Sequence, residues 1–198
     1  RDRGCLELKA GIKQEIGVDL SRVSCVRRLE SIAKSFAPSC LVYLPGMIDN
    51  MSLEEITTNS LIQVFMCNTF AYWLCIKACK GEMSRRGFGR FCSVSSIGSK
   101  FGGAKNRLSY TVSKSNLEFF PREFKELGRS NVYINNIICG VTDTKMLLAK
   151  DEEKEQRAQL IPVGRLATPG EIADEIYRVC SELNKYRHCS NTTVSGGE

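Results

Sequence analysis

Histidine is almost missing from this sequence of 198 residues, since only His188 occurs. The ten cysteines include no Cys-x-x-Cys pair, and a zinc site needs closely spaced cysteine or histidine ligands. The sequence therefore predicts no metal centre. Most cysteines lie within apolar runs, so we expect them to be free and reduced in the core of a cytoplasmic protein.

Long apolar runs and concentrated positive charge are also lacking. No apolar stretch reaches 18 residues, so no membrane-spanning helix is predicted. The opening Arg-Asp-Arg-Gly has neither a Met nor the apolar core of a signal peptide, as expected of a chain that was trimmed or begins inside a longer one. Lys and Arg total 28 against 22 Asp and Glu, and only residues 80–90 concentrate them. That stretch, KGEMSRRGFGR, is typical of a solvated loop, so neither nucleic acid nor membrane is an expected partner.

What is present is an ordinary globular composition, with 42% hydrophobic and 25% charged residues. These values exclude a disordered chain, a collagen-like repeat and a coiled coil. The length suits one domain, and no linker or internal repeat divides it, so residues 1–198 are predicted to form a single domain.

The hydrophobic periodicity alternates between helical and extended patterns. It predicts helices over residues 5–14, 22–36, 59–83, 108–127, 151–160 and 170–183. It predicts strands over residues 16–20, 41–44, 90–95, 132–138 and 192–194. Ser21 is a candidate cap for the second helix, and Pro121 should kink the fourth or mark an irregularity in it. Strands joined by crossover helices indicate an α/β fold, a parallel sheet with helices on both faces.

Three side chains are candidates for chemistry. Tyr110 and Lys114 are four residues apart at the start of a predicted helix, so they share one face. Ser96 ends a predicted strand, at the sheet edge where open α/β folds bind ligands. Alone, a Tyr-x-x-x-Lys pair is weak support for an active site. Tyr110 could equally be a half-buried core ring, and Ser96 could be a turn residue at the strand end.

Five segments together carry a stronger signal. They are Asn68 in CNTF and the stretches CSVSS (92–96), ICGVTDT (138–144), IPVGR (161–165) and TVSGG (193–197). In this order, with Tyr110 and Lys114, they resemble the short-chain dehydrogenase/reductase family along the whole chain from Arg1. The chain is most similar to members of the 3-oxoacyl-[acyl-carrier-protein] reductase type. Residues 96–110 also resemble, more weakly, relatives associated with bacterial surface-polysaccharide synthesis.

The resemblance implies a Rossmann-like doubly wound sheet and a catalytic set of Ser96, Tyr110, Lys114 and Asn68. Tyr110 would be the general acid/base, and Ser96 would bond the reacting oxygen. Lys114 would bind the nicotinamide ribose and, together with the cofactor's charge, lower the pKa of Tyr110. Asn68 would anchor a water, although it could instead pair internally. The cofactor-binding residues implied are Arg1, Asp19, Pro45, Gly46, Tyr110, Lys114, Cys139, Gly140, Thr142 and Thr144.

The sequence departs from the family at three places. The glycine-rich phosphate loop, TGxxxGxG, does not occur, so the first βαβ portion of the fold is expected to be missing from the given chain. Residues 43–46 read Tyr-Leu-Pro-Gly where the family has Asn-Asn-Ala-Gly. Cys139 stands where the family has the proline of a Pro-Gly pair.

The resemblance predicts an NAD(P)(H)-dependent oxidoreductase acting on a small carbonyl or secondary-alcohol substrate. NADP(H) is favoured because Arg1 and Arg3 would suit its 2′-phosphate, while Asp2 leaves NAD(H) open. The aromatic content of the helices carrying Asn68 and Tyr110 predicts a homodimer or homotetramer. The alternative is a non-catalytic scaffold or interaction protein that keeps the fold without binding cofactor.

Overall fold

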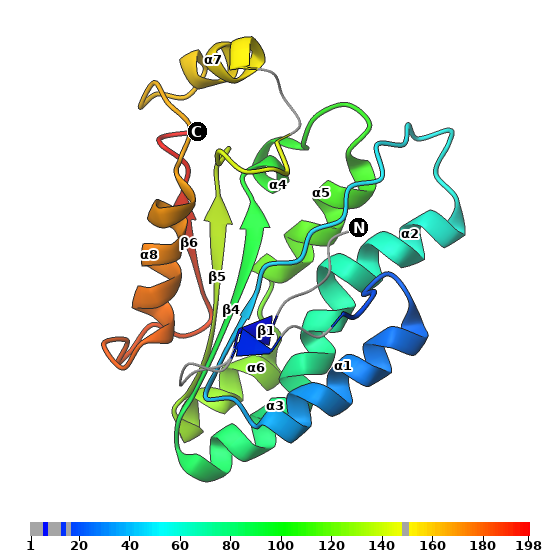
Figure 1. The fold of residues 1–198 in the computed structure, drawn as a ribbon. Helices are drawn as coiled ribbons and strands as arrows, with labels where there is room; N and C mark the ends of the chain where they lie inside the picture. Colours follow the sequence, from blue (N-terminus) through cyan, green and yellow to red (C-terminus); the bar gives the residue numbers. More distant parts are fainter. Residues whose placement is uncertain (1–5, 8–12, 15–16, 148–150) are drawn as a thin grey trace.

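The computed structural model describes residues 6–7, 13–14, 17–147 and 151–198. Its centre is a four-stranded parallel sheet in the order β3-β4-β5-β6 (Figure 1). The strands are β3 (Cys40–Tyr43), β4 (Gly89–Ser96), β5 (Val132–Cys139) and β6 (Ser190–Val194). The longest ladder pairs Gly89 with Val132 at one end and Ser96 with Cys139 at the other. The parallel α/β architecture predicted from the sequence is confirmed.

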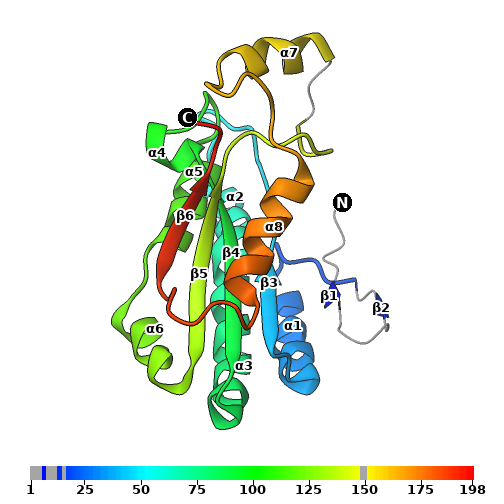
Figure 2. The same cartoon turned by 90° about the vertical axis from the view of Figure 1, so that its left-hand side faces the viewer.

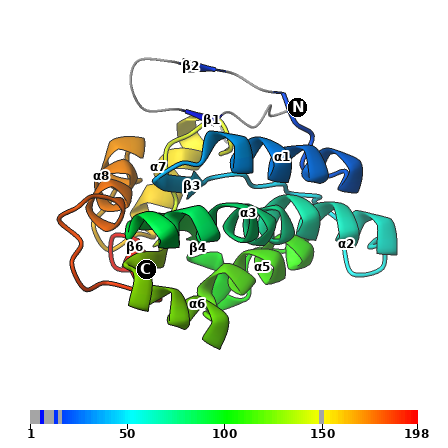
Figure 3. The ribbon, with the colours of Figure 1, turned by 90° about the horizontal axis from the view of Figure 1, so that it is seen from below.

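Helices cover both faces of this sheet. On one face lie α1 (Val23–Phe36), α3 (Ala71–Arg86) and α5 (Leu108–Ser115), side by side in the view from below (Figure 3). The other face carries α8 (Pro169–Cys180), which packs against β4 and β5 and lies on the near side of the sheet in Figure 2. The remaining helices are α2 (Thr58–Phe65), α4 (Gly98–Phe101), α6 (Arg122–Glu126) and α7 (Asp151–Gln159).

Two apolar clusters hold the layers together. The larger lies between the sheet and the α1–α3 pair, and its fully buried members include Tyr72, Ile76 and Phe91. The smaller lies beneath α8 and contains Cys92, Ile137, Ile172 and Val179. None of the nine cysteines within the described residues forms a disulfide.

A π-helical segment interrupts the long helix predicted over residues 59–83. The helix runs as α2, then the π segment η1 (Met66–Phe70), then α3, and Thr57 caps its start in a reciprocal pair with Ser60. By length and mean hydropathy alone, the span Thr58–Arg86 is able to cross a membrane, and 44% of its most apolar window is buried inside the protein. Tyr72, Ile76 and Met83 of this span belong to the larger cluster, so it is a core helix here.

Pro121 breaks the helix predicted over residues 108–127. After α5 the chain passes through the short 3-10 turn η2 (Asn116–Glu118) and becomes extended at Phe119. Pro121 is then the N-cap residue of α6, which continues into the 3-10 turn η3 (Leu127–Ser130). A proline is well tolerated at a helix start, because no hydrogen bond is lost there.

The first elements differ from the prediction. The described parts of 5–14 form a short antiparallel pair, β1 (Leu6–Glu7) and β2 (Lys13–Gln14), so the helix expected there is wrong. No strand occurs over the described part of 16–20, because the Asp19 carboxylate accepts hydrogen bonds from the Ser21 amide and hydroxyl and bends the chain. Ser21 therefore does not cap α1, whose N-cap residue is Arg22.

The basic stretch 80–90 is also not the loop that was predicted. It contains the end of α3, a left-handed Gly87 and the start of β4. Arg90 is buried, and its guanidinium donates to the carbonyls of Gly89, Asn131 and Asn184. These bonds partner both terminal nitrogens of the guanidinium, which offsets much of the cost of burying the charge, while its Nε is buried without a hydrogen-bond partner.

Gly140 sets the spacing between the ends of β5 and β6. Its amide donates to the Val194 carbonyl at 2.8 Å, and a Cβ added at Gly140 would lie 2.7 Å from the Ser195 Cα. Because backbone cannot yield as a flexible side chain does, we expect Gly140→Ala to lower the free energy of unfolding by about 1–3 kcal/mol. Gly81→Ala, inside α3 with nothing within 4 Å, should raise it by about 0.5–1 kcal/mol. Urea denaturation measures both, and equal stability of Gly140→Ala and the wild type would contradict the first expectation.

Candidate active site

Lys114 lies where β3 and β4 end. Its Nζ donates to the Pro45 carbonyl at 2.8 Å and to the Val94 carbonyl at 2.9 Å. The residue is 3% exposed, and burial lowers the pKa of its ammonium from 10.5 to about 8. Two of its three N–H donors are used by the protein, which leaves one for another acceptor.

Asn68 fixes the loop after β3 to α5. Its Oδ1 accepts from the Met47 amide at 2.7 Å, and its Nδ2 donates to the Met47 carbonyl and to the Ser113 hydroxyl. The side chain is fully buried within the π segment. The internal pairing that the sequence left open for Asn68 is therefore present.

Ser113 is a residue of this site that the sequence reasoning missed. Its hydroxyl accepts from Asn68 and donates to the Tyr110 carbonyl at 2.8 Å. Thr69 adds a second link, since its hydroxyl donates to the Ser113 carbonyl at 2.6 Å. The spacing from Tyr110, three residues on the same helix, was the available signal.

Ser96 ends β4, and Tyr110 lies on α5. The Ser96 hydroxyl acts on the Tyr110 phenol by lowering its pKa, and the Ser96 Oγ accepts from the Gly98 amide at 3.3 Å. Both residues are partly exposed, whereas Asn68 and Lys114 are buried. The Ser113 hydroxyl joins the Tyr110 carbonyl to the Asn68 side chain.

The pKa of Tyr110 is raised by the chain's own residues. Burial, and next the Cys139 thiol, raise it above the usual phenol value, while the Ser96 hydroxyl and the Arg107 guanidinium lower it by less. The physical reason for the net upward shift is desolvation, which disfavours the phenolate. The predicted lowering depends on Lys114 together with the charge of a bound cofactor, and it stays a prediction.

The segment after β5 closes one side of the site. The Cys139 thiol donates to the Ser95 carbonyl at 3.2 Å, and burial raises the pKa of that thiol. Thr142 donates to the Gly140 carbonyl and pairs with Ala167, while Thr144 is exposed. A Cβ added at Gly46 would lie 3.0 Å from the Met146 methyl and 3.5 Å from the Lys114 Cε.

The other predicted cofactor contacts lie apart from this group or outside the described residues. Asp19 is exposed, and it contacts Ser21 and forms an ion pair with Arg22 at 3.2 Å. Arg1 is outside the described residues. A cavity of about 150 Å³ opens on the α8 side of Gly140, lined among others by Val141, Arg165 and Ser195, and none of the four predicted catalytic residues lines it.

Comparison with known proteins identifies the family. The family profile described as Enoyl-(Acyl carrier protein) reductase matches residues 23–198. The 3-oxoacyl-[acyl-carrier-protein] reductase FabG of Aquifex aeolicus is 30% identical over 96% of this chain and 78% of that protein. The chain belongs to the short-chain dehydrogenase/reductase family, which confirms the resemblance seen in the sequence.

Further relatives differ in how much of their length is matched. The MabA reductase of Mycobacterium tuberculosis is 30% identical over 79% of this chain, which spans 64% of its length. Among solved structures, a 3-oxoacyl (acyl-carrier-protein) reductase of Agrobacterium tumefaciens with NADP bound superimposes with a TM-score of 0.83 at 21% identity, covering 93% of this chain and 74% of that one. A gluconate 5-dehydrogenase of Beutenbergia cavernae gives 0.82 at 26%, covering 92% and 75%.

The buried ammonium predicts a measurable titration. We expect the Lys114 side chain to titrate near pH 8, whereas the unfolded chain holds that proton up to about pH 10.5. Between these values the unfolded state binds more protons, so the contribution of Lys114 to the free energy of unfolding rises with pH and is unfavourable below pH 8. NMR of ¹³Cε-labelled lysine measures the midpoint, with Lys114→Arg identifying the resonance. A midpoint near 10.5 would refute the low pKa.

Proposed function

We propose that this protein is an NAD(P)(H)-dependent oxidoreductase that interconverts a carbonyl and a secondary alcohol. The observation that carries the proposal is the arrangement of three side chains at the carboxyl ends of β3 and β4. Ser96 ends β4, Tyr110 lies on α5, and the buried Lys114 ammonium follows one helical turn later. Two hydroxyls that meet at a partly exposed strand end can together bind one substrate oxygen.

In this proposal each side chain has a separate task. The raised pKa keeps Tyr110 protonated at neutral pH, so the phenol can donate its proton to a carbonyl oxygen during reduction. Ser96 donates a second hydrogen bond to that oxygen. The bound nicotinamide supplies the hydride chemistry. Asn68 and Ser113 hold the helix that carries Tyr110, through bonds of 2.8 Å.

The described residues fit the nicotinamide half of such a cofactor. Lys114 has one N–H donor left, which suits a ribose hydroxyl. Gly46 leaves open the space beside the Lys114 side chain that a Cβ would fill. Thr142 and Gly140 lie along the adjacent strand end, where backbone and hydroxyl groups can contact the cofactor.

The substrate class follows from the relatives. Several bear names of 3-oxoacyl-[acyl-carrier-protein] reductases, and an Acinetobacter relative is an acetoacetyl-CoA reductase, 28% identical over 85% of this chain and 68% of that protein. We therefore propose a 3-oxoacyl thioester as substrate. Met146 supports this choice, because its exposed side chain gives the loop over Gly46 an apolar surface.

A homodimer or homotetramer stays a prediction. Its support is apolar surface on the helices beside the site, where Phe70, Trp73, Val112 and Phe119 are between 37% and 70% exposed. Phe70 stacks on both Phe65 and Trp73 with ring centroids under 6 Å apart, so part of this surface is already ordered.

The non-catalytic scaffold remains the second candidate. It is favoured by one observation, the replacement of the family's Asn pair by Tyr43 and Leu44. Tyr43 is buried and its phenol donates to the Cys67 carbonyl, so it braces the π segment η1 instead of the cofactor loop. Binding of a nicotinamide cofactor separates the two candidates.

The proposal predicts the effect of removing one hydroxyl. Tyr110→Phe should lower turnover of acetoacetyl-CoA with NADPH by about 100-fold or more, because the proton donor is lost. Binding of NADPH measured by calorimetry should change little. Tyr133→Phe is the matched control, since its phenol donates to the Lys185 carbonyl away from the site. Turnover by Tyr110→Phe equal to that of the control would rule out the acid/base role.

Cofactor preference is a separate prediction. We propose NADP(H) over NAD(H) because Arg1 and Arg3 in the sequence suit a 2′-phosphate, and two structural neighbours carry NADP in their names. An Arg–phosphate bond contributes about 1.5–3 kcal/mol, so we expect NADPH to bind at least tenfold more tightly than NADH in calorimetry. Tighter binding of NADH would reverse the preference, and binding of neither would favour the scaffold.

A further inference from the structure

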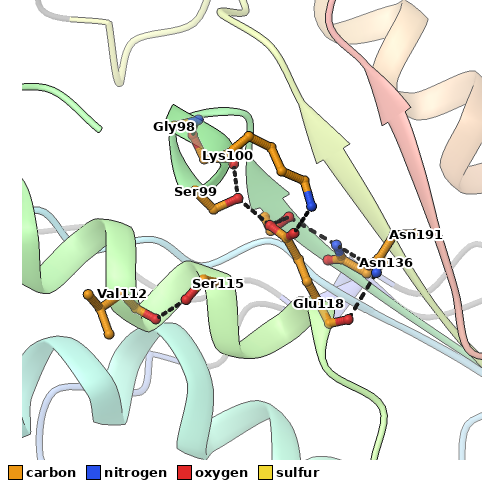
Figure 4. Close-up of polar contacts among 10 residues, drawn as sticks. Gly98, Ser99, Lys100, Val112, Ser115, Glu118, Asn136 and Asn191 are labelled. Atoms are coloured by element: carbon orange, nitrogen blue, oxygen red, sulfur yellow. Dashed lines mark hydrogen bonds and ion pairs between the residues drawn. The ribbon is translucent and has the colours of Figure 1, made fainter. Parts of the chain in front are cut away.

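Glu118 is an acidic side chain that neither the family resemblance nor the proposed chemistry uses. It ends η2, one helical turn beyond Lys114, and its side chain is 11% exposed. One carboxylate oxygen accepts from the hydroxyls of Ser95, at 3.0 Å, and Ser99. The other forms an ion pair with the Lys100 ammonium at 2.7 Å (Figure 4).

These contacts lie on both sides of Ser96. Ser95 directly precedes it in β4, and Ser99 belongs to α4, the short helix that follows. The Ser96 carbonyl lies 2.7 Å from the same Ser99 hydroxyl, so the carbonyl and the Glu118 carboxylate share its one proton. One carboxylate therefore holds the residue before Ser96 and the turn after it.

The sheet in turn holds Glu118 in place. Asn191 of β6 donates to the Glu118 carbonyl at 2.9 Å, and its Oδ1 accepts from Asn136 of β5 at 3.0 Å. Asn136 also donates to the Ser95 hydroxyl at 2.9 Å, which closes a ring of hydrogen bonds back to Glu118 (Figure 4). The ring connects three strands to η2.

The energetics favour a rigid arrangement. Hydrogen bonds to a carboxylate are roughly twice as strong as those between neutral groups. Ser95 is buried, so removing the carboxylate would leave its hydroxyl without an acceptor in a place where water does not replace it easily. The α4 turn has only four residues, and a helix that short depends on such contacts.

We propose that Glu118 is a positioning residue for Ser96, acting through Ser95 and Ser99. It sets the direction of the Ser96 hydroxyl toward Tyr110 by fixing the backbone on both sides. The catalytic part of this proposal rests on the proposed oxidoreductase function, whereas the fixing of the 96–101 turn does not.

The first test measures the turn itself. Amide hydrogen exchange of residues 97–101 is followed in the wild type and in Glu118→Ala. We expect exchange of the Lys100 amide, which donates to the Ile97 carbonyl, to accelerate at least tenfold while β4 and β5 amides keep their rates. Glu30→Ala is the matched control, because Glu30 forms a 2.8 Å ion pair with Lys77 in the same helix layer away from Ser96. Unchanged exchange in Glu118→Ala overturns the proposal whatever the activity.

The second test separates positioning from charge. With NADPH and acetoacetyl-CoA, Glu118→Ala should lower kcat at least tenfold with an unchanged KM for NADPH. Glu118→Gln, which keeps an acceptor oxygen for the two hydroxyls, should stay within threefold of the wild type, and so should Lys100→Met. Ser99→Ala should show a smaller loss than Glu118→Ala, and it serves as the test if that variant does not fold. If Lys100→Met falls as far as Glu118→Ala, the ion pair is responsible and the proposal is wrong.

The two proposals fail in different ways. A wild type that turns over nothing refutes the proposed oxidoreductase activity, and the hydrogen exchange then decides the role of Glu118 alone. A wild type that is active, with Glu118→Ala as active as Glu30→Ala, refutes the positioning role and leaves the activity intact.

Discussion

The buried ammonium of Lys114 is the constraint around which the rest of the site is arranged. Its bonds to the Pro45 and Val94 carbonyls connect α5 to the ends of β3 and β4 at once. A charged group buried this deeply requires that the strand ends and the helix stay within hydrogen-bonding distance of one another. Any separation would leave the ammonium unpaired. Asn68 reinforces the same junction from the π segment, through Met47 and Ser113. The backbone that carries the partly exposed Ser96 and Tyr110 hydroxyls is thus held in place by buried hydrogen bonds.

The sheet changes character along its length. Toward the amino ends of β4 and β5 the side chains facing α3 are apolar, with Phe91 and Ile134 in the larger cluster. Toward the carboxyl ends Ser93, Ser95 and Asn136 are buried and bonded to one another. A buried polar network stabilises only when each member finds a partner, and here those partners come from three strands and η2. The polar end of the sheet coincides with the candidate active site.

Much of this architecture could be predicted from the sequence. Short apolar and β-branched runs located β4 and β5 within a residue or two, and the order of family landmarks indicated which strand ends carry Ser96 and Cys139. These features depend on local pattern and on a topology with few alternatives.

Other features depend on contacts between distant residues, and no local pattern reports them. The burial of Arg90 requires the carbonyls of Asn131 and Asn184, so its sequence neighbourhood suggested a loop instead. The bend at Asp19 overrides the alternating apolar residues around it. The direction in which the pKa of Tyr110 shifts depends on how deeply the ring is buried. A sequence motif does not contain that information. The ring of bonds around Glu118 joins residues more than 70 positions apart.

The π segment Met66–Phe70 has a geometric consequence for the helix that contains it. A π turn holds more residues than the α turn it replaces, while successive residues of an α-helix are rotated by about 100°. If the same residues formed a regular α-helix instead, everything after the segment would turn by about that angle. Tyr72 and Ile76 would then leave the core for directions that are exposed here. The π turn therefore absorbs one residue of chain length and sets which face of α3 is buried relative to α2.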